Sequence, residues 1–259
     1  MISYIKSELY RIAHYKWTYL FIIICSLLLL SANITLMAVN CSEANFPYAT
    51  TSFAINNYIS SIGTIYILCI FVASMIFGNE HGNHTMKNSV SYGISRGVIY
   101  FGKFIVEIIY GILAIIIITA FYAGSAYLML KHTNANEFKL LVQACFAGLP
   151  LLLYALAASN CFLFMLEGSN AAIGAATGLL LAFPIVCGTL GMKFELFAQL
   201  YKLMPLTMAN NIGIDSVTST LVLLWPGNTG YSNYWLYSML QLVLITLIGF
   251  VVFRKREIK

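Results

Sequence analysis

The sequence predicts an all-α polytopic membrane protein. We expect six transmembrane helices, an N-terminal amphipathic helix, a polar cytoplasmic loop, and outer re-entrant or surface helices between spans five and six. Of the 259 residues, 60% are hydrophobic and only 9% are charged, whereas soluble domains carry about 25% charged residues. The apolar residues form long blocks, and about 20 apolar residues are needed to cross the hydrocarbon core as a helix. Helices are expected because lipid offers the backbone no hydrogen-bond partners.

The apolar blocks define one membrane domain over residues 1–259. We expect the first block, Trp17–Val39, to be a retained span, since it is too long for a signal peptide and no clean small-residue cleavage site follows its apolar part. The predicted spans lie near residues 17–39, 52–78, 104–130, 138–166, 171–189 and 234–253.

The lysines and arginines set the orientation. With both termini inside, ten of them lie on the cytoplasmic side and four outside, which agrees with the positive-inside rule. The inner ten are Lys6, Arg11, Lys16, Lys87, Arg96, Lys103, Arg254, Lys255, Arg256 and Lys259, and the outer four are Lys131, Lys139, Lys193 and Lys202. We therefore expect a multi-pass protein with both termini in the cytoplasm. The net charge of +5 indicates topology and not nucleic-acid binding, because no soluble basic face exists.

Residues 1–16 predict an amphipathic helix lying on the membrane surface. Ile2, Ile5, Leu9 and Ile12 share one face; Ser3, Ser7, Arg11 and His14 lie opposite, with Lys6 and Glu8 on the flanks. This helix either anchors the chain only or helps to seat a cytoplasmic partner.

Residues 79–103 form the most polar run and the main cytoplasmic loop. Asn83 or Thr85 could cap a short helix there, Gly93 could end it, and Ser95 could cap the third span. The loop is either a solvated connection whose basic residues set topology or a helix that transmits force from a soluble partner.

This loop resembles the one between the second and third spans of ABC-2 type transporter permeases. The similarity rests on Glu80, Thr85, the pair Lys87-Asn88, the run Gly93-Ile94-Ser95-Arg96, and Lys103, with His84 where the family usually has glycine. The small permeases of bacitracin resistance and lantibiotic immunity are the most alike. The start of the chain, Lys6-Ser7-Glu8 with Arg11, resembles the elbow helix of the same family.

The resemblance implies a permease subunit of an exporter in the bacterial cell membrane. It implies a second permease copy, identical or paralogous, and separate ABC ATPase subunits that hold ATP and Mg²⁺. Residues 83–93 would be a coupling helix on the ATPase, and a peptide antibiotic, removed for self-protection or resistance, would be a fitting amphipathic substrate. The coupling contacts implied are Glu80, Asn83, Thr85, Lys87, Asn88, Ser95 and Arg96, with Lys6, Glu8 and Arg11 on the elbow helix.

We expect no ATP site on this chain. Gly97 to Lys103 matches seven positions of a phosphate-binding loop, but Phe104 stands where Ser or Thr must hold Mg²⁺, and a span follows instead of a soluble helix.

We also expect no catalytic set, no metal site and no cofactor. His81 and His84 with Glu80 are too few for a typical metal site. The HExxH motif is absent from the sequence. The six cysteines contain no CxxC, and five of them lie within spans.

Two features inside the spans have alternative readings. Glu107 is an intramembrane ionisable residue that we expect to pair with Lys103 at i,i+4. Gly174 and Gly178 form a GxxxG motif, which permits close packing either within the subunit or at a dimer interface.

Residues 190–233 form a long outer segment. Apolar residues from Phe194 to Met204 recur at helical spacing until Pro205, and a second apolar run, Val217–Trp225, is too short to span. We expect two partial or surface helices, acting as a gate or as a passive cover.

The leading hypothesis is the membrane subunit of an ATP-driven exporter. The alternatives are an ATP-independent secondary carrier or structural membrane component and, third, a membrane-embedded enzyme without a visible active site. An adjacent gene for a Walker-motif ATPase would favour the first.

Overall fold

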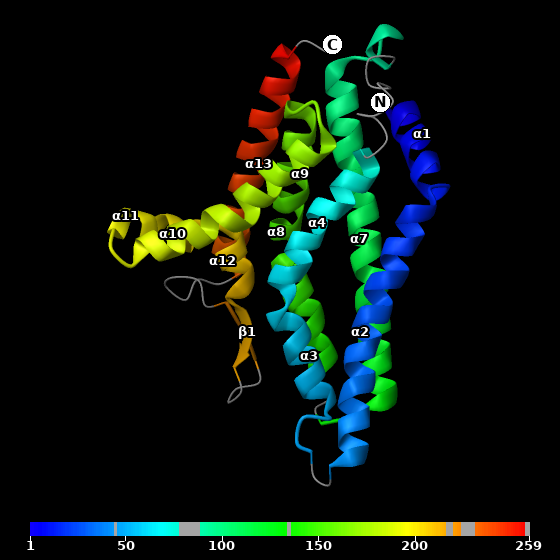
Figure 1. The fold of residues 1–259 in the computed structure, drawn as a ribbon, viewed down its shortest axis with the longest axis vertical. Helices are drawn as coiled ribbons and strands as arrows, with labels where there is room; N and C mark the ends of the chain where they lie inside the picture. Colours follow the sequence, from blue (N-terminus) through cyan, green and yellow to red (C-terminus); the bar gives the residue numbers. More distant parts are fainter. Residues whose placement is uncertain (44–45, 78–88, 134–135, 216–219, 224–230, 257–259) are drawn as a thin grey trace.

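The computed structural model describes residues 1–43, 46–77, 89–133, 136–215, 220–223 and 231–256. Figure 1 shows a tall helical bundle with both chain termini at the same end. Its elements are α1 (Ile2–Ala13), α2 (Lys16–Ser42), α3 (Thr51–Ser60), α4 (Ile62–Phe77), α7 (Arg96–Met129), α8 (Glu137–Met165), α9 (Ser169–Thr177), the π-helix η1 (Gly178–Ala182), α10 (Phe183–Gly191), α11 (Glu195–Leu203), α12 (Pro205–Asn210), β1 (Ile212–Asp215), β2 (Thr220–Leu223) and α13 (Tyr231–Lys255).

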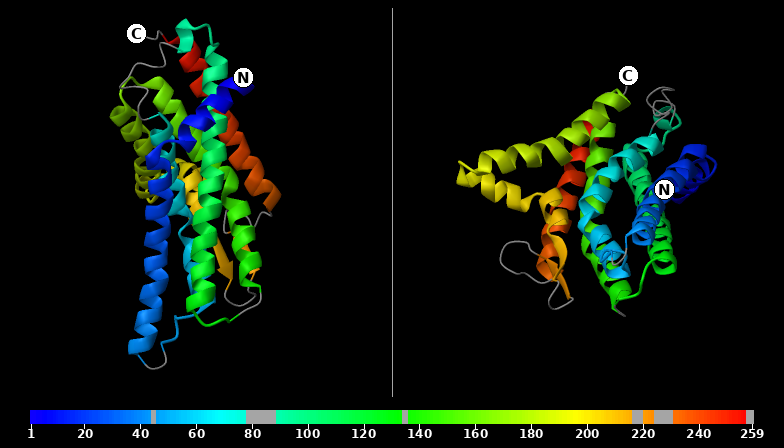
Figure 2. Two further views of the ribbon diagram at one scale, coloured as in Figure 1. Left: turned by 90° about the vertical axis from the view of Figure 1, so that its right-hand side faces the viewer. Right: turned by 60° about the horizontal axis from the view of Figure 1, so that its bottom comes forward.

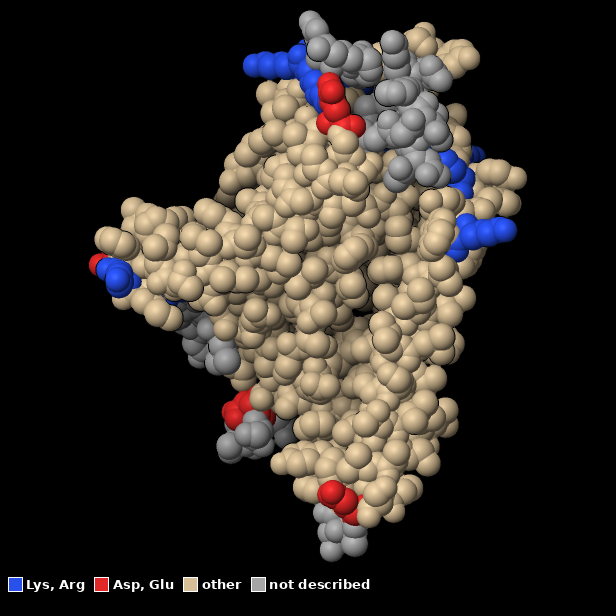
Figure 3. Space-filling view, viewed as in Figure 1, with Lys and Arg blue, Asp and Glu red and all other residues tan. Residues whose placement is uncertain are grey.

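The described helices confirm an all-α polytopic membrane protein. Five are long and apolar enough to cross a membrane, and six spans result if the bent pair α3 and α4 counts as one. Basic side chains in Figure 3 gather mainly at the end that carries the termini, while the middle of that face is almost free of charge. This distribution is what a bilayer around the middle of the bundle requires.

The second span bends by 55° between α3 and α4. Ser61 lies at the break, and its hydroxyl donates to the carbonyl of Tyr58 at 2.8 Å. Gly63 follows, and a Cβ atom there would lie 2.0 Å from Oδ1 of Asn210 in α12. The bend therefore has a local cause in the serine and glycine and a tertiary one in the close approach of α12.

The third span begins earlier than the sequence predicted. α7 starts at Arg96 and not near residue 104, so the last eight residues assigned to the 79–103 loop are helical. The reason is the cap, since Ser95 Oγ accepts from the Val98 N–H at 3.4 Å. The prediction that Ser95 caps this span is confirmed.

α8 is the central helix of the bundle. It packs against α4, α7, α9 and α13, and its buried face is rich in alanine, which lets neighbouring helices approach closely. Near the terminal end, Tyr100, Phe77, Phe164 and Phe253 form a second buried cluster. Tyr100 in this cluster donates to the Thr246 carbonyl at 3.1 Å, which ties α7 to α13.

The predicted fifth span is irregular and forms an arm. α9 continues through η1 into α10, and α11 folds back against α10, so that the α10–α11 arm projects sideways from the bundle (Figures 1 and 2). A Cβ atom on Gly191 would lie 2.9 Å from the Cα of Ala198, so glycine permits this tight return. The prediction of a helix that ends before Pro205 is confirmed by α11.

The second helix predicted in the outer segment is wrong. Thr220–Leu223, inside the run Val217–Trp225, forms strand β2, which pairs antiparallel with β1. The register places Ile212 opposite Leu223, and both side chains are buried. The hairpin packs against α8, and this tertiary contact favours a strand for a run too short to span.

Candidate functional site

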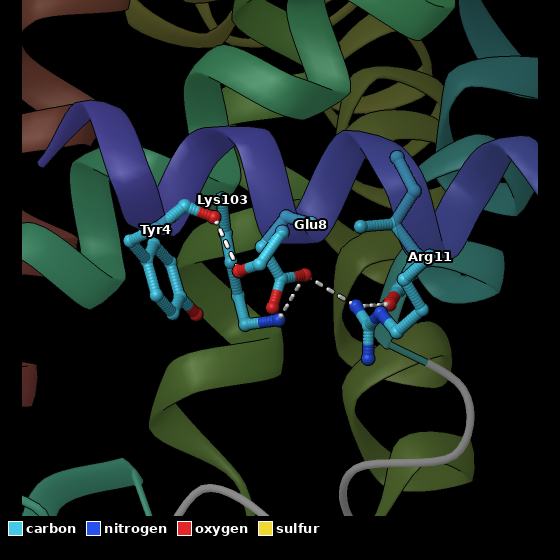
Figure 4. A network of polar contacts seen from close by, with 6 residues as sticks. Tyr4, Glu8, Arg11 and Lys103 are labelled. Atoms are coloured by element: carbon cyan, nitrogen blue, oxygen red, sulfur yellow. Dashed lines mark hydrogen bonds and ion pairs between the residues drawn. The ribbon is translucent and has the colours of Figure 1, made fainter.

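The polar groups under α1 form a clasp that joins three helices (Figure 4). We call Glu8, Arg11, Lys103 and the carbonyl of Ile76 the α1 clasp. Glu8 Oε2 accepts from Arg11 Nη2 at 2.5 Å and from Lys103 Nζ at 3.2 Å. The same Arg11 nitrogen donates to the Ile76 carbonyl at 2.9 Å. The clasp therefore connects α1 to the last turn of α4 and to the first turns of α7, the two helices that flank residues 78–95.

The Glu8–Lys103 pair of the α1 clasp is largely shielded from water, whereas the Arg11 side chain is 40% exposed. The side chain of Lys103 is 1% exposed and that of Glu8 is 11% exposed, and Lys103 Nζ lies 4.9 Å from the centre of the Phe77 ring. A buried charge is costly unless its partners stay in place. Arg11 also complements the negative end of α4 by binding a carbonyl of its last turn.

Glycine seats α1 on α7. A Cβ atom on Gly102 would lie 2.7 Å from the ring of Tyr4, so a larger residue would push α1 away. Ile5 and Leu9 are partly buried against the core, and Ile12 is buried. Gly102 and Lys103 are the last two residues of the sequence that matches a phosphate-binding loop. In the structure Gly102 permits the packing of α1, and Lys103 forms an ion pair with Glu8.

The predicted faces of the first helix need correction. Glu8 was placed on a flank of the helix but is buried in the clasp. Arg11 was placed on the polar face, yet it reaches inward to α4. The reason is tertiary, since a buried lysine on α7 draws the carboxylate inward. Lys6 remains exposed.

Arg96 does not face freely outward from the loop. Its Nη1 donates to the carbonyls of Phe253 at 3.2 Å, Arg254 at 2.7 Å and Arg256 at 2.6 Å. These carbonyls belong to the end of α13, where backbone acceptors lack helical partners. Arg96 therefore joins the start of α7 to the end of α13.

Arg256 makes a matching connection. Its Nη1 donates to the carbonyl of Phe164 at 2.7 Å, and its Nη2 lies 3.4 Å from Glu167 Oε1. Arg256 was predicted only as a topology signal, whereas Arg96 was predicted both as a topology signal and as a coupling contact. A basic residue next to a helix C-terminus is a general signal for carbonyl capping, but it does not say which helix is capped.

Most of the predicted coupling residues cannot be placed. Glu80, Asn83, Thr85, Lys87 and Asn88 lie outside the described residues. The same holds for His81 and His84. Residues 89–91 are helical, and Gly93 follows with a φ of 82°. The Gly93 N–H donates to the Val90 carbonyl at 3.0 Å, so this turn ends at the glycine, as predicted.

The predicted pair of Lys103 and Glu107 is wrong. Lys103 reaches Glu8, and neither carboxylate oxygen of Glu107 has a hydrogen-bond partner among the described residues. The side chain of Glu107 is fully buried within α7. Lys103 instead binds the carboxylate that α1 brings against α7, a contact between distant segments that one sequence cannot reveal.

Gly174 and Gly178 do not pack closely within the described part of the subunit. A Cβ atom at either position would meet no heavy atom within 4 Å. Close packing of this motif inside the subunit therefore has no support, and packing against a second copy stays a prediction.

Comparison with known families gives the class of the protein. The chain matches the family described as ABC-2 family transporter protein over residues 4–185, which is more than half of its length. No curated protein matches the chain. The chain therefore belongs to the ABC-2 transporter family. It is a multi-pass membrane permease component of an ABC transporter, a class that works with ABC ATPase subunits.

Proposed function

We propose that this chain is the membrane-spanning subunit of an ABC exporter of amphipathic substrates such as peptide antibiotics. It serves self-immunity or resistance in the bacterial cell membrane. Separate ATPase subunits hydrolyse ATP with Mg²⁺, and two permease copies, identical or paralogous, enclose the pathway. The likeness of the 80–103 motif to bacitracin-resistance and lantibiotic-immunity permeases supports the substrate class, and the scarcity of charge in the spans suits an apolar or amphipathic cargo.

The α1 clasp supports the part of the proposal that concerns coupling to an ATPase. It binds the helix before the 78–95 segment, the helix after it and the elbow helix into one unit. Force applied by an ATPase to Lys87 and its neighbours, or to the exposed Lys6, reaches α4 and α7 together. Arg96 extends the same unit to the end of α13, so the proposed contact surface moves three spans at once.

Coexpression with an ABC ATPase from an adjacent gene, followed by copurification, tests the coupling. We expect the ATPase to copurify with the tagged permease and Lys87→Glu to reduce both the bound ATPase and transport. Lys193→Glu is the matched control, because Lys193 is exposed in the connection between α10 and α11, away from the proposed surface. Absence of any copurified ATPase, together with normal transport by Lys87→Glu, refutes the coupling role.

Peptide export is tested separately. Cells that express the permease with its ATPase should tolerate more bacitracin or lantibiotic than cells with a Walker-lysine variant of that ATPase. Equal tolerance to both classes of peptide in the two strains refutes the proposed substrate class while leaving the coupling result intact.

Glu107 favours one alternative function. A buried intramembrane carboxylate without a hydrogen-bond partner among the described residues is the type of group that carries ions in secondary transporters. An ATP-independent carrier would keep transporting after ATP depletion, stop when the ion gradient collapses, and lose activity in Glu107→Gln. The ABC exporter shows the opposite response to the first two treatments.

A further inference from the structure

The first helix does not use its apolar face to contact lipid. Ile12 is buried in the core of the bundle, and Ile5 and Leu9 are partly buried against that core. An amphipathic helix on a membrane normally buries its apolar face at the boundary between headgroups and acyl chains. Because the bundle covers that face of α1, any contact between α1 and the membrane surface is made by its outer face.

The outer face of α1 carries basic and aromatic side chains. Lys6, Tyr10 and His14 are four residues apart, so they lie on one side of the helix, and all three are exposed. The rings of Tyr10 and His14 lie 4.1 Å apart. Lys16 and Trp17, at the start of α2, are exposed as well. Such side chains are favoured at the headgroup level of a membrane, because each has an apolar body and a polar tip.

Hydroxyl groups hold the junction between α1 and α2. Thr18 Oγ1 donates to the Ile12 carbonyl at 3.0 Å, and the Tyr19 hydroxyl donates to the Ala13 carbonyl at 2.7 Å. Tyr110 of α7 donates to the Thr18 carbonyl at 2.7 Å. These bonds satisfy carbonyls at the end of α1 that lack helical partners. They also fix the outer face of α1 relative to α2.

This outer face has a net positive charge. Glu8 is the only acidic residue among residues 1–42, and its carboxylate is buried in the α1 clasp against Lys103. Figure 3 shows basic side chains along the flank where α1 lies, with no acidic side chain in view among them. Each lysine or arginine close to a membrane surface raises the affinity for anionic lipid about fivefold. Lys6 and Lys16 therefore favour an anionic partner.

Apolar side chains continue this surface along α2. Four of them follow Trp17 at helical spacing and are between 40% and 65% exposed, namely Leu20, Ile24, Leu27 and Leu28. Within the subunit α2 packs mainly against α7, so this side of α2 is open to lipid. A phospholipid with its headgroup at the junction would place its acyl chains against these residues.

We propose that the outer face of α1 and the start of α2 form a binding site for an anionic phospholipid. The phosphate of the lipid pairs with Lys6 and Lys16, Trp17 lies at the headgroup level, and the acyl chains lie along α2. A zwitterionic lipid fits the same apolar strip but brings a cationic group towards the lysines, so the site selects the anionic lipid. The proposed ATPase contact then falls to Lys87 and its neighbours and not to Lys6.

Quenching of Trp17 fluorescence by brominated lipids tests this site. The protein is the full chain with Trp225→Phe and Trp235→Phe, which leaves Trp17 as its one tryptophan. It is reconstituted without ATPase in vesicles of equal parts phosphatidylglycerol and phosphatidylcholine, with bromine on the acyl chains of one lipid at a time. We expect at least a fivefold preference for phosphatidylglycerol next to Trp17. Lys6→Gln/Lys16→Gln should lower it below twofold, whereas Lys16→Arg, which keeps the charge, should retain it.

Lys139→Gln is the matched control, because Lys139 is exposed in the first turn of α8, which follows the end of α7 remote from α1. It should leave the preference unchanged, and unchanged melting temperatures would show that the variants are folded. Equal quenching by both lipids, or a preference that survives Lys6→Gln/Lys16→Gln, overturns the proposal. Equal quenching together with loss of ATPase copurification in Lys6→Gln/Lys16→Gln would assign this face to the ATPase instead.

Discussion

The α1 clasp predicts a large loss of stability when Glu8 is replaced by alanine. Lys103 would keep a buried ammonium, 1% exposed, but would lose its ion pair with Glu8. Breaking a buried pair by removing one partner costs about 3–5 kcal/mol. We take about 3 kcal/mol, the lower end, because the Phe77 ring still faces the ammonium at 4.9 Å. Since 1 kcal/mol shifts the melting temperature of a domain of this size by roughly 2–4 °C, Glu8→Ala should melt about 6–12 °C lower.

The assay is thermal unfolding of the detergent-purified protein, followed by thiol reactivity of the buried Cys69 and Cys161. The double variant Glu8→Gln/Lys103→Met removes both charges and should recover most of the loss. Glu195→Ala is the control, since Glu195 is exposed on α11 and its loss should cost little. If Glu8→Ala melts like the parent protein, or if the double variant is no more stable than Glu8→Ala, the electrostatic account of the clasp fails.

Three further predictions follow from single contacts. Gly102→Ala should displace α1, because the new Cβ would lie 2.7 Å from the Tyr4 ring. The displacement should raise protease cleavage near the N-terminus. Gly97→Ala is the control and should leave cleavage unchanged, because its Cβ would lie 3.7 Å from the nearest atom. Arg96→Met should speed hydrogen exchange at the end of α13 by removing three carbonyl contacts, and unchanged exchange would contradict the capping role. Asn33→Ala should cost about 0.6–1.7 kcal/mol in unfolding by sodium dodecyl sulfate, since Asn33 joins α2 to a backbone carbonyl and a serine of α7; a stability equal to that of the parent protein would show that this interhelical bond is replaced.

Structural features that depend on residues close together in the sequence were predicted correctly. The Ser95 cap, the turn ending at Gly93 and the stop of α11 before Pro205 each depend on one side chain or one backbone conformation near the element. Such signals are local, because a cap or a proline acts on its own helical turn. The long apolar blocks were equally clear, since length and composition suffice to define a span.

Predictions that needed contacts between distant segments failed. Glu8 and Lys103 are 95 positions apart, so no spacing rule could pair them, and the local rule paired Lys103 with Glu107 instead. The run containing β2 has no local preference strong enough to exclude a helix, and its pairing with β1 decided the outcome.

The first helix shows both what the sequence predicts and what tertiary contacts decide. Its amphipathic pattern predicted a helix within residues 1–16, and residues 2–13 form one, because hydrophobic spacing in one segment indicates a helical period. Which polar residues turn inward was decided by the fold, because a buried charge requires an opposite charge wherever the chain brings one close. The sequence by itself thus determined a polytopic membrane protein with an elbow helix. Only the tertiary structure decided that Glu8 and Arg11 fasten this helix to α4 and α7.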